Sequence, residues 1–252
     1  MITFRDVTKV LSGRAVLDGV SFNVKRGETF VIVGPSGAGK SVTLKHMVRL
    51  LTPDRGDVLV GDVTVSAAAG GELELIRERF GYLFQGGALL AWLSVAENVA
   101  LPLREKTRMK NEEILERVHE TLRLVGLEND GHKQPSEISG GMQKRAGLAR
   151  AIIRRPEIVL YDEPTSGLDP VTSRTIDDLI DGLREELGVT SVVVTHDLHS
   201  ALSIGSRIAM LHGGKIVELA PPAEFIKSSE TEVRKFLESQ FITKEGSWGQ
   251  AR

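Results

Sequence analysis

Residues 29–41 read Thr-Phe-Val-Ile-Val-Gly-Pro-Ser-Gly-Ala-Gly-Lys-Ser, an apolar run that passes directly into a glycine-rich loop. The continuous apolar run Thr29–Val33 predicts a buried parallel strand. After the loop, apolar residues recur at helical spacing over Leu44–Leu51, and Pro53 is expected to end that helix. The sequence thus predicts a strand, a glycine loop and a helix in direct succession.

The loop fits the phosphate-binding pattern G-x-x-x-x-G-K-[ST]. Its glycines let successive backbone N–H groups turn toward phosphate oxygens, and the start of the following helix adds positive potential. The lysine is expected to reach the β- and γ-phosphates, and the final serine to bind Mg²⁺. A chance match is disfavoured by the strand before the loop and the amphipathic helix after it. The expected phosphate-binding residues are Gly34, Pro35, Ser36, Gly37, Ala38, Gly39, Lys40 and Ser41.

Composition excludes several classes of protein. The 252 residues are 41% hydrophobic and 26% charged, which is typical of a globular chain and not of a disordered or collagen-like one. Lys plus Arg is 32 and Asp plus Glu is 34, a net charge of −2 that argues against nucleic acid as the main partner. Cysteine is absent, so disulfides, zinc–thiolate sites and cysteine nucleophiles are excluded. No run reaches the roughly 18 apolar residues of a membrane span, and the N-terminus lacks a signal-peptide layout, so we expect a cytoplasmic chain.

Hydrophobic patterns along the chain predict an α/β fold. Alternating strands and helices imply a parallel sheet, and the glycine pair at 213–214 predicts a hairpin. The stretch from about 86 to 150 changes character and is interpreted as a helical insertion, with an amphipathic helix whose apolar stripe includes Leu115. The expected strands are Ile2–Val7, Val20–Val24, Phe80–Phe84, Ile158–Tyr161, Ser191–Thr195, Arg207–Leu211 and Lys215–Leu219. The expected helices are Asn111–Val125, one starting near Gly140, Val171–Leu187 and a short one near Glu230–Glu238, with a loose tail over Thr243–Arg252.

Two carboxylates follow the apolar run Ile158–Tyr161. At a strand end Asp162 is placed to hold Mg²⁺ opposite the phosphate loop, and Glu163 to polarise an attacking water as general base. The alternative is a surface acidic pair that begins a loop.

Four further motifs are weak when taken singly. Ser139-Gly140-Gly141 precedes a predicted helix and could bind phosphate, although a plain helix cap explains it too. Gln85 and His196 each follow a predicted strand, where they could contact a γ-phosphate or its water. A lone histidine is more often structural. Ser166–Asp169 lies just after the acidic pair.

In this order and spacing, these residues resemble the ATP-binding subunit of an ABC transporter. The resemblance covers roughly residues 1–240 and leaves 241–252 as a C-terminal tail. It implies a P-loop NTPase fold of the ABC type, with a parallel-sheet core, an antiparallel β subdomain and a helical subdomain inserted at about 86–155. By resemblance, 34–41 is the Walker A loop, Gln85 the Q-loop glutamine, Ser139-Gly140-Gly141 the signature, Asp162 the Walker B aspartate, Glu163 the catalytic glutamate, Ser166–Asp169 the D-loop and His196 the switch histidine. Catalytic roles fall to Glu163, His196 and Gln85, and Mg²⁺ binding to Ser41, Gln85 and Asp162.

The resemblance also explains why one chain carries two phosphate-binding loops. In such ATPases, ATP sits on the Walker A loop of one protomer and is closed over by the signature of the other. We therefore expect a homodimer that binds ATP and Mg²⁺ and whose closing and opening drives transport.

The stretches Phe84–Leu90 and Ser94–Glu105, together with Met142, resemble one branch of the family: the ATPases of bacterial lipid systems that work with MCE-domain proteins, the Mla type. This implies a permease in the inner membrane, a lipid-binding MCE-domain protein and in some systems a STAS-domain subunit. The chain would sit peripherally on the cytoplasmic face and power movement of phospholipids or other hydrophobic lipids. The apolar stretch Ala88–Leu93 could grip a cytoplasmic helix of the permease, or it could belong to the core of the insertion.

Other readings stay open to different degrees. The chain could serve an importer or exporter for another substrate. A soluble ABC ATPase acting on ribosomes or DNA usually has two cassettes or a coiled-coil arm, and neither is visible. A GTP-driven switch would need an Asn-Lys-x-Asp stretch, which this sequence does not contain. A catalytically inactive adaptor is disfavoured because Lys40, Ser41, Asp162, Glu163 and His196 are all present. One departure from the family is that Leu11 stands where an aromatic residue commonly stacks on adenine, which puts base selectivity in doubt.

Overall fold

The structure is a computed structural model that describes residues 1–243 and 246–247. The chain divides into two compact units, which are described separately: residues 1–77 with 190–252, and residues 78–189. The predicted loose tail lies outside the described residues except at 243, 246 and 247. The helical subdomain predicted at about 86–155 stays a prediction.

The first unit contains an antiparallel sheet with the strand order β2-β1-β4-β5. Its strands are β1 (Ile2–Leu11), β2 (Arg14–Val24), β4 (Arg55–Val60) and β5 (Val63–Thr64). β1 and β2 are longer than the predicted strands because Ser12 and Gly13 close a two-residue hairpin turn, with φ of 49° and 77°. Positive φ at both positions matches the right-handed twist of the paired strands.

The same unit contains four strands of the second sheet, in the order β10-β9-β3-β8, of which β9, β3 and β8 are parallel. They are β3 (Thr29–Val33), β8 (Thr190–Thr195), β9 (Arg207–His212) and β10 (Lys215–Ala220). β3 pairs in parallel with β8 and β9, and all of its residues are buried, as the apolar run predicted. β10 pairs antiparallel with β9, which confirms the hairpin at Gly213-Gly214.

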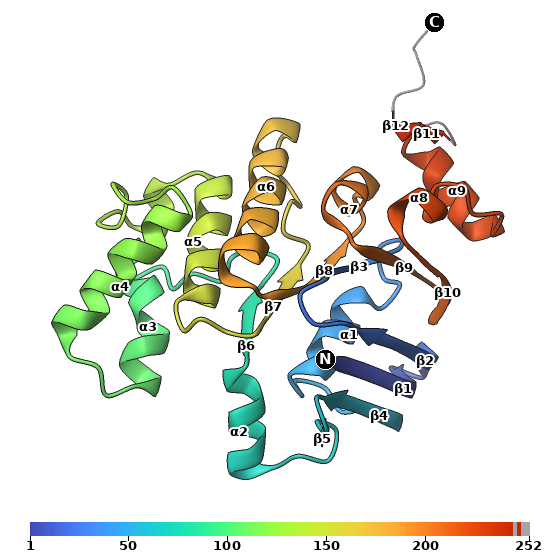
Figure 1. The fold of residues 1–252 in the computed structure, drawn as a ribbon, viewed down its shortest axis with the longest axis horizontal. Coiled ribbons are helices and arrows are strands. Elements are labelled where there is room, and N and C mark those ends of the chain that lie inside the picture. Colours follow the sequence, from blue (N-terminus) through green and yellow to red (C-terminus); the bar gives the residue numbers. More distant parts are fainter. Residues whose placement is uncertain (244–245, 248–252) are drawn as a thin grey trace, which may run out of the picture. The chain divides into compact units, whose positions relative to one another are not determined.

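The helices of this unit are short (Figure 1). They are α1 (Lys40–Met47), α7 (Leu198–Ile204), α8 (Pro222–Phe225) and α9 (Thr231–Ser239), followed by β11 (Ile242–Thr243) and β12 (Gly246–Ser247). α1 ends before the expected Leu51, and Arg49 beyond it takes a left-handed conformation with φ of 52°. α2 (Gly70–Glu78), which the sequence did not suggest, crosses the boundary between the units.

Three stacked aromatic rings join the two sheets of the first unit. Phe22 lies between Phe4 and Phe30, with ring centroids 4.5 and 5.1 Å apart. The guanidinium of Arg207 lies 5.2 Å from the centroid of Phe30 and forms an ion pair with Glu28 at 2.7 Å. The strand that carries the phosphate loop is therefore anchored on the antiparallel sheet.

The second unit packs helices around two parallel strands, β6 (Phe80–Leu83) and β7 (Ile158–Asp162). Its helices are α3 (Val95–Lys106), α4 (Asn111–Leu124), the 3₁₀ turn η1 (Pro135–Glu137), α5 (Gly140–Ile152) and α6 (Pro170–Leu187). α3 was not expected. The stripe on α4 is buried as predicted except at Leu115, which is 50% exposed, so its inclusion was wrong.

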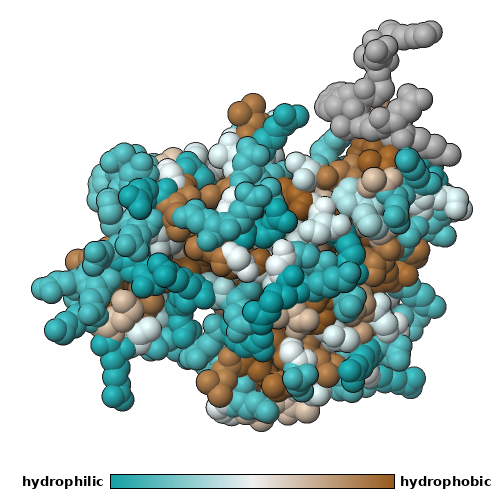
Figure 2. Space-filling model, in the orientation of Figure 1, coloured by the Kyte–Doolittle hydropathy of each residue, from teal (hydrophilic) through white to brown (hydrophobic). Residues whose placement is uncertain are grey.

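On the face drawn in Figure 2, hydrophilic side chains cover most of the surface and hydrophobic ones show in small groups. Within the part of the chain that the structure describes, no helix combines the length and the apolar character needed to cross a membrane.

Candidate active site

The phosphate loop follows β3 as the sequence predicted, and α1 begins at Lys40. A Cβ on Gly34 would lie 2.3 Å from the backbone oxygen of Leu211, so a side chain there would collide with backbone. Gly39 has φ of 106°, and a Cβ on it would lie 2.9 Å from the backbone oxygen of Val16. These two glycines are therefore required by close approach, while Pro35–Gly37 form the exposed tip of the loop.

Lys40 is folded back on its own loop. Its residue is only 6% exposed, and Nζ donates to the backbone oxygens of Gly34 at 2.9 Å and Pro35 at 3.2 Å. The turn below it is closed by Ala38, whose N–H donates to Pro35. The ammonium thus lies against the loop that is expected to surround the phosphates.

His196 lies next to this loop by strand register. β3 and β8 are parallel, and Val33 pairs with Thr195, so Gly34 and His196 both directly follow paired residues at the carboxyl edge of the sheet. Ligands of open parallel sheets bind at this edge. The sequence-predicted histidine is exposed there.

The loop that carries His196 is held by a residue that sequence reasoning missed. Gln240, at the end of α9, donates from Nε2 to the backbone oxygen of His196 at 2.6 Å and accepts from the backbone N–H of Leu198 at 2.8 Å. Asp197 caps α7 by accepting from His199 and Ser200. No local pattern signalled Gln240, because it lies 44 residues from His196.

In the second unit, register also brings Gln85 near the acidic pair. β6 and β7 are parallel, and Leu83 pairs with Tyr161. Gln85 lies two residues beyond Leu83, and Asp162 lies one residue beyond Tyr161, at the same edge of the sheet. Asp162 and Glu163 are only 6% and 7% exposed, which contradicts a plain surface acidic pair.

Tyr82 is a further partner that the sequence did not identify. Its hydroxyl donates to Asp162 Oδ2 at 3.3 Å, and its ring stacks on Phe84 with centroids 4.2 Å apart. Burial first, and then the charge and hydrogen bond of Asp162, raise the pKa of Tyr82. The tyrosine therefore stays protonated and donates a hydrogen bond to the carboxylate.

The signature residues begin α5. Ser139 is the N-cap, and its Oγ accepts from the backbone N–H of Met142 at 3.3 Å, so the plain capping role is real. Ser139 and Gly140 are also exposed, as a phosphate-binding role requires, whereas Gly141 is buried. A Cβ on Gly141 would lie 2.5 Å from Cγ2 of Thr172 in α6.

The segment after Glu163 folds back on it. Ser166 Oγ donates to the backbone oxygen of Glu163 at 3.0 Å, and Asp169 caps α6 by accepting from Val171 and Thr172. Lys144 of α5, which sequence reasoning also missed, donates to the same oxygen of Glu163 at 3.0 Å and to the backbone oxygen of Gln85. The second unit therefore connects Gln85, Glu163 and Ser166 through one buried cation.

Leu11, which stood at the expected adenine position, is 36% exposed at the end of β1. In the described residues, no group of three or more His, Cys, Asp or Glu side chains forms a metal cluster.

Comparison with known proteins identifies the family. The model of the ABC transporter family matches residues 17–166. The probable ribonucleotide transport ATP-binding protein mkl of Mycobacterium leprae (strain TN) is 41% identical over 241 residues, which are 96% of this chain and 70% of that protein. The intermembrane phospholipid transport system ATP-binding protein MlaF of Escherichia coli (strain K12) is 38% identical over 238 residues, 94% of this chain and 88% of that protein.

A solved structure supports the same fold. The dimeric post-hydrolysis state of the ATP-binding cassette MJ0796, bound to ADP and Pi, matches with a TM-score of 0.80 and 37% identity, covering 88% of this chain and 99% of that one. The expected α/β fold of the ABC type is thereby confirmed. This chain belongs to the ABC transporter family and is an ATP-hydrolysing subunit.

Proposed function

We propose that this chain powers an inner-membrane ABC transporter that moves phospholipids or other hydrophobic lipids between membranes, acting as a peripheral homodimer on the cytoplasmic face. The observation that carries the lipid assignment is the likeness to MlaF over 94% of the chain. The stretches Phe84–Leu90 and Ser94–Glu105, with their resemblance to the Mla type, support it. An MCE-domain protein and a STAS-domain subunit are the proposed accessory partners.

In the proposed mechanism, the loop Gly34–Ser41 surrounds the β- and γ-phosphates of ATP with backbone N–H groups, and Lys40 neutralises their charge. Glu163 polarises the attacking water as general base. His196 and Gln85 contact the γ-phosphate or that water. Support comes from the exposed position of His196 beside the loop and from the buried backbone restraints on Glu163.

The donor set fits Mg²⁺. Ser41 offers a hydroxyl, Gln85 an amide oxygen and Asp162 a carboxylate, all hard oxygen ligands of the kind Mg²⁺ prefers. A site completed by substrate phosphates needs only one or two protein carboxylates. When bound, the ion neutralises charge that develops on the phosphates. Tyr82 keeps one oxygen of Asp162 oriented by its hydrogen bond.

ATP is proposed to be shared by two copies of the chain. The exposed Ser139 and Gly140 at the start of α5 present a helix N-terminus that can receive the γ-phosphate of ATP bound to the partner. The dimeric state of MJ0796 supports this assembly.

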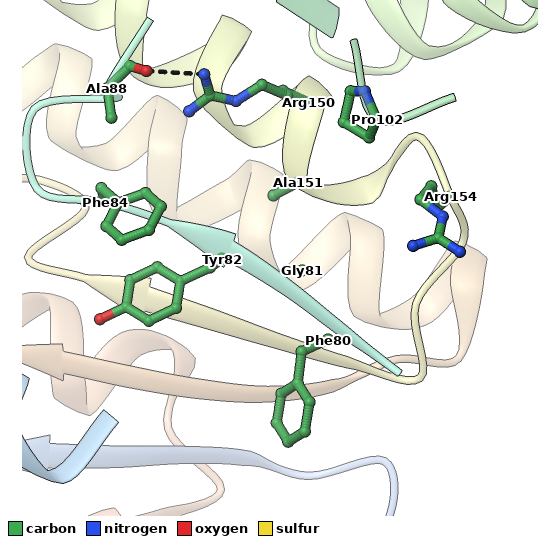
Figure 3. Close-up of a pocket in the computed structure, with 9 residues that line it drawn as sticks. All are labelled: Phe80, Gly81, Tyr82, Phe84, Ala88, Pro102, Arg150, Ala151 and Arg154. Atoms are coloured by element: carbon green, nitrogen blue, oxygen red, sulfur yellow. Dashed lines mark hydrogen bonds between the residues drawn. The ribbon is translucent and has the colours of Figure 1, made fainter. Parts of the chain in front are cut away.

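The surface beside Gln85 is proposed to receive a cytoplasmic helix of the permease. Trp92 is 75% exposed and Phe84 38% exposed, whereas Leu90 and Leu93 are half-buried. Close by, a pocket of 380 Å³ is lined by residues that include Phe80, Tyr82, Phe84, Pro102, Arg150 and Arg154. Figure 3 shows the rings of Tyr82 and Phe84 side by side, with Arg150 bonded to Ala88. Exposed aromatic groups beside two cations suit an amphipathic helix.

The test is a mild-detergent pull-down of the tagged chain from its native membranes, with mass spectrometry of proteins and extracted lipids. Recovery of a permease, an MCE-domain protein and phospholipid would support the proposal. A permease with a different substrate protein would leave the ATPase and overturn the lipid cargo, and the 41% identity to mkl makes such another cargo the second candidate. Recovery of no membrane protein would favour a soluble ATPase.

The docking surface is tested in the same pull-down with Trp92→Ala, and with Leu115→Ala as the matched control. Leu115 is 50% exposed on α4, so its truncation removes a comparable exposed apolar group in the same unit. Loss of the permease with the first variant alone is expected. Equal recovery with both variants would rule out Trp92 as a contact.

A further inference from the structure

Lys144 of α5 is a buried lysine that donates to three acceptors in two separate segments of the second unit, one at Gln85 and one at Glu163–Ser166. The residue is 6% exposed. Its Nζ donates to the backbone oxygen of Gln85, to the backbone oxygen of Glu163 at 3.0 Å and to Ser166 Oγ at 3.4 Å. Because an ammonium carries three N–H donors, these three acceptors use its donor capacity in full.

Packing alone does not require a lysine at this position. Burial lowers the pKa of Lys144, while the carboxylates of Glu163 and Asp162 act in the opposite direction. A methionine of similar length would fill the same space without the desolvation of a charge. What the lysine adds is a set of hydrogen bonds that ties the backbone at Gln85 to the turn Glu163–Ser166.

The backbone of Glu163 takes a conformation that needs such a restraint. Its φ is 51°, a left-handed conformation that non-glycine residues seldom adopt. Such conformations persist when the surrounding contacts over-determine them. The Glu163 oxygen accepts from Lys144 Nζ, from Ser166 Oγ at 3.0 Å and from the Ser166 N–H at 3.2 Å. If Lys144 is replaced, the two remaining donors of these three both belong to Ser166.

The Q-loop, defined here as Gln85–Ala88, rests on the same helix. Arg150 donates to the backbone oxygens of Ala88 at 2.7 Å and Gly87 at 2.8 Å. A Cβ on Gly147 would lie 2.9 Å from the oxygen of Gly87, so backbone meets helix there without an intervening side chain. A displacement of the Q-loop must therefore be taken up by α5, and Lys144 is where α5 meets the backbone of Glu163.

We propose that Lys144 is a positioning residue that links the Q-loop to Glu163, so that permease docking beside the Q-loop sets the position of the general base. This inference rests on the proposed function, because it takes Glu163 as the base and the Q-loop surface as the docking site. Lys144 itself is not proposed to touch the substrate. It acts by holding the main chain from which the carboxylate of Glu163 extends.

The test compares Lys144→Met, Lys144→Gln and, as the matched control, Arg145→Met. Arg145 is the neighbouring cation on α5 and donates to the backbone oxygens of Val125 and Gly126, away from the Q-loop and Glu163. Its loss removes a comparable structural tie. The readouts are the Kd for ATP, kcat of the isolated chain and the ratio of kcat in the recovered membrane complex to kcat alone.

Lys144→Met is expected to leave the Kd for ATP within about twofold and to lower kcat about 10- to 100-fold, since small misplacements of a catalytic group have effects of this size. The ratio of kcat in the membrane complex to kcat of the isolated chain should fall toward one. Lys144→Gln, which keeps an N–H donor, should recover part of both. Arg145→Met should lower the melting temperature without changing kcat or the ratio at a temperature where it is folded.

An unchanged kcat and ratio in Lys144→Met would overturn the inference, and if that variant does not fold, the same result in Lys144→Gln decides. An equal kinetic loss in Arg145→Met would also overturn it, because the effect would then be general loosening of α5. Failure of the proposed function shows separately: Glu163→Gln would then retain its turnover, or no membrane complex would be recovered.

Discussion

The second glycine of the signature, Gly141, is required by packing as well as by any contact with phosphate. A Cβ at this position would lie 2.5 Å from Cγ2 of Thr172, closer than carbon atoms approach in proteins. The methyl group of Thr172 cannot simply rotate away. The hydroxyl of Thr172 donates to Asp169 Oδ2 at 2.5 Å, so rotation of this side chain would break that hydrogen bond.

The expected cost of Gly141→Ala follows from two opposing effects. Overpacking by one methyl group destabilises by about 1–3 kcal/mol, and replacing a helical glycine with alanine stabilises by up to about 1 kcal/mol. We therefore expect a net loss of stability of about 0–3 kcal/mol. Thr172→Ser removes the colliding methyl and keeps the hydroxyl on Asp169. The double variant should accordingly recover about 1–2 kcal/mol relative to the sum of the single changes.

The assay is urea unfolding of the four members of this double-mutant cycle without nucleotide, so that phosphate binding does not contribute. Gly140→Ala is the matched control. Its Cβ would lie 3.7 Å from Leu168 Cδ2, an ordinary contact, and it should not be destabilised. A coupling between positions 141 and 172 below about 0.5 kcal/mol, within the additivity of independent sites, would refute the packing argument.

Three further predictions concern the chemistry. Glu163→Gln should keep ATP binding and lower turnover by about 10²–10⁴-fold, and near-normal turnover in a phosphate-release assay would reject the role of general base. Gln240→Glu keeps an acceptor for the Leu198 N–H but places a carboxylate oxygen against the backbone oxygen of His196. We therefore expect kcat to fall about tenfold or more while the Kd for ATP stays unchanged. An unaltered kcat would show that Gln240 does not position His196. Burial lowers the pKa of His46, which is 1% exposed, below its value of 6.5 in the unfolded chain. The stability that the neutral, buried imidazole contributes is therefore fully present above pH 6.5, and it is lost as the pH falls toward the pKa of the folded state. Urea unfolding between about pH 7.5 and 5.5 should show a slope of up to about 1.4 kcal/mol per pH unit from this group, absent in His46→Gln, and equal slopes in both proteins would contradict it.

Sequence patterns predicted an element correctly where its structure depends on residues that are close together in the chain. Every residue of Thr29–Val33 is buried, so the side chains on both faces of this strand are covered, and the residues from Phe30 to Val33 are accordingly all apolar. Gly213-Gly214 supplies two positive φ angles, and the hairpin forms there. α3 was missed although Ser94 and Glu97 form a capping box, a signal visible in the sequence. Pro102 lies inside α3, and a proline within a helix normally disfavours the helix. Burial of the apolar side chains of α3 offsets that cost.

The residues that sequence reasoning missed in the site act over long distances along the chain. Lys144 contacts Gln85 across 59 residues and Glu163 across 19, and Gln240 contacts His196 across 44. Composition and spacing do not separate a buried lysine from a surface one, since only the fold decides what surrounds it. The roles proposed for motif residues such as Glu163 rest on side-chain type, which can be seen in the sequence. Their geometry is set by hydrogen-bond donors that belong to no motif, so the sequence predicts which groups react while the fold shows what holds those groups in place.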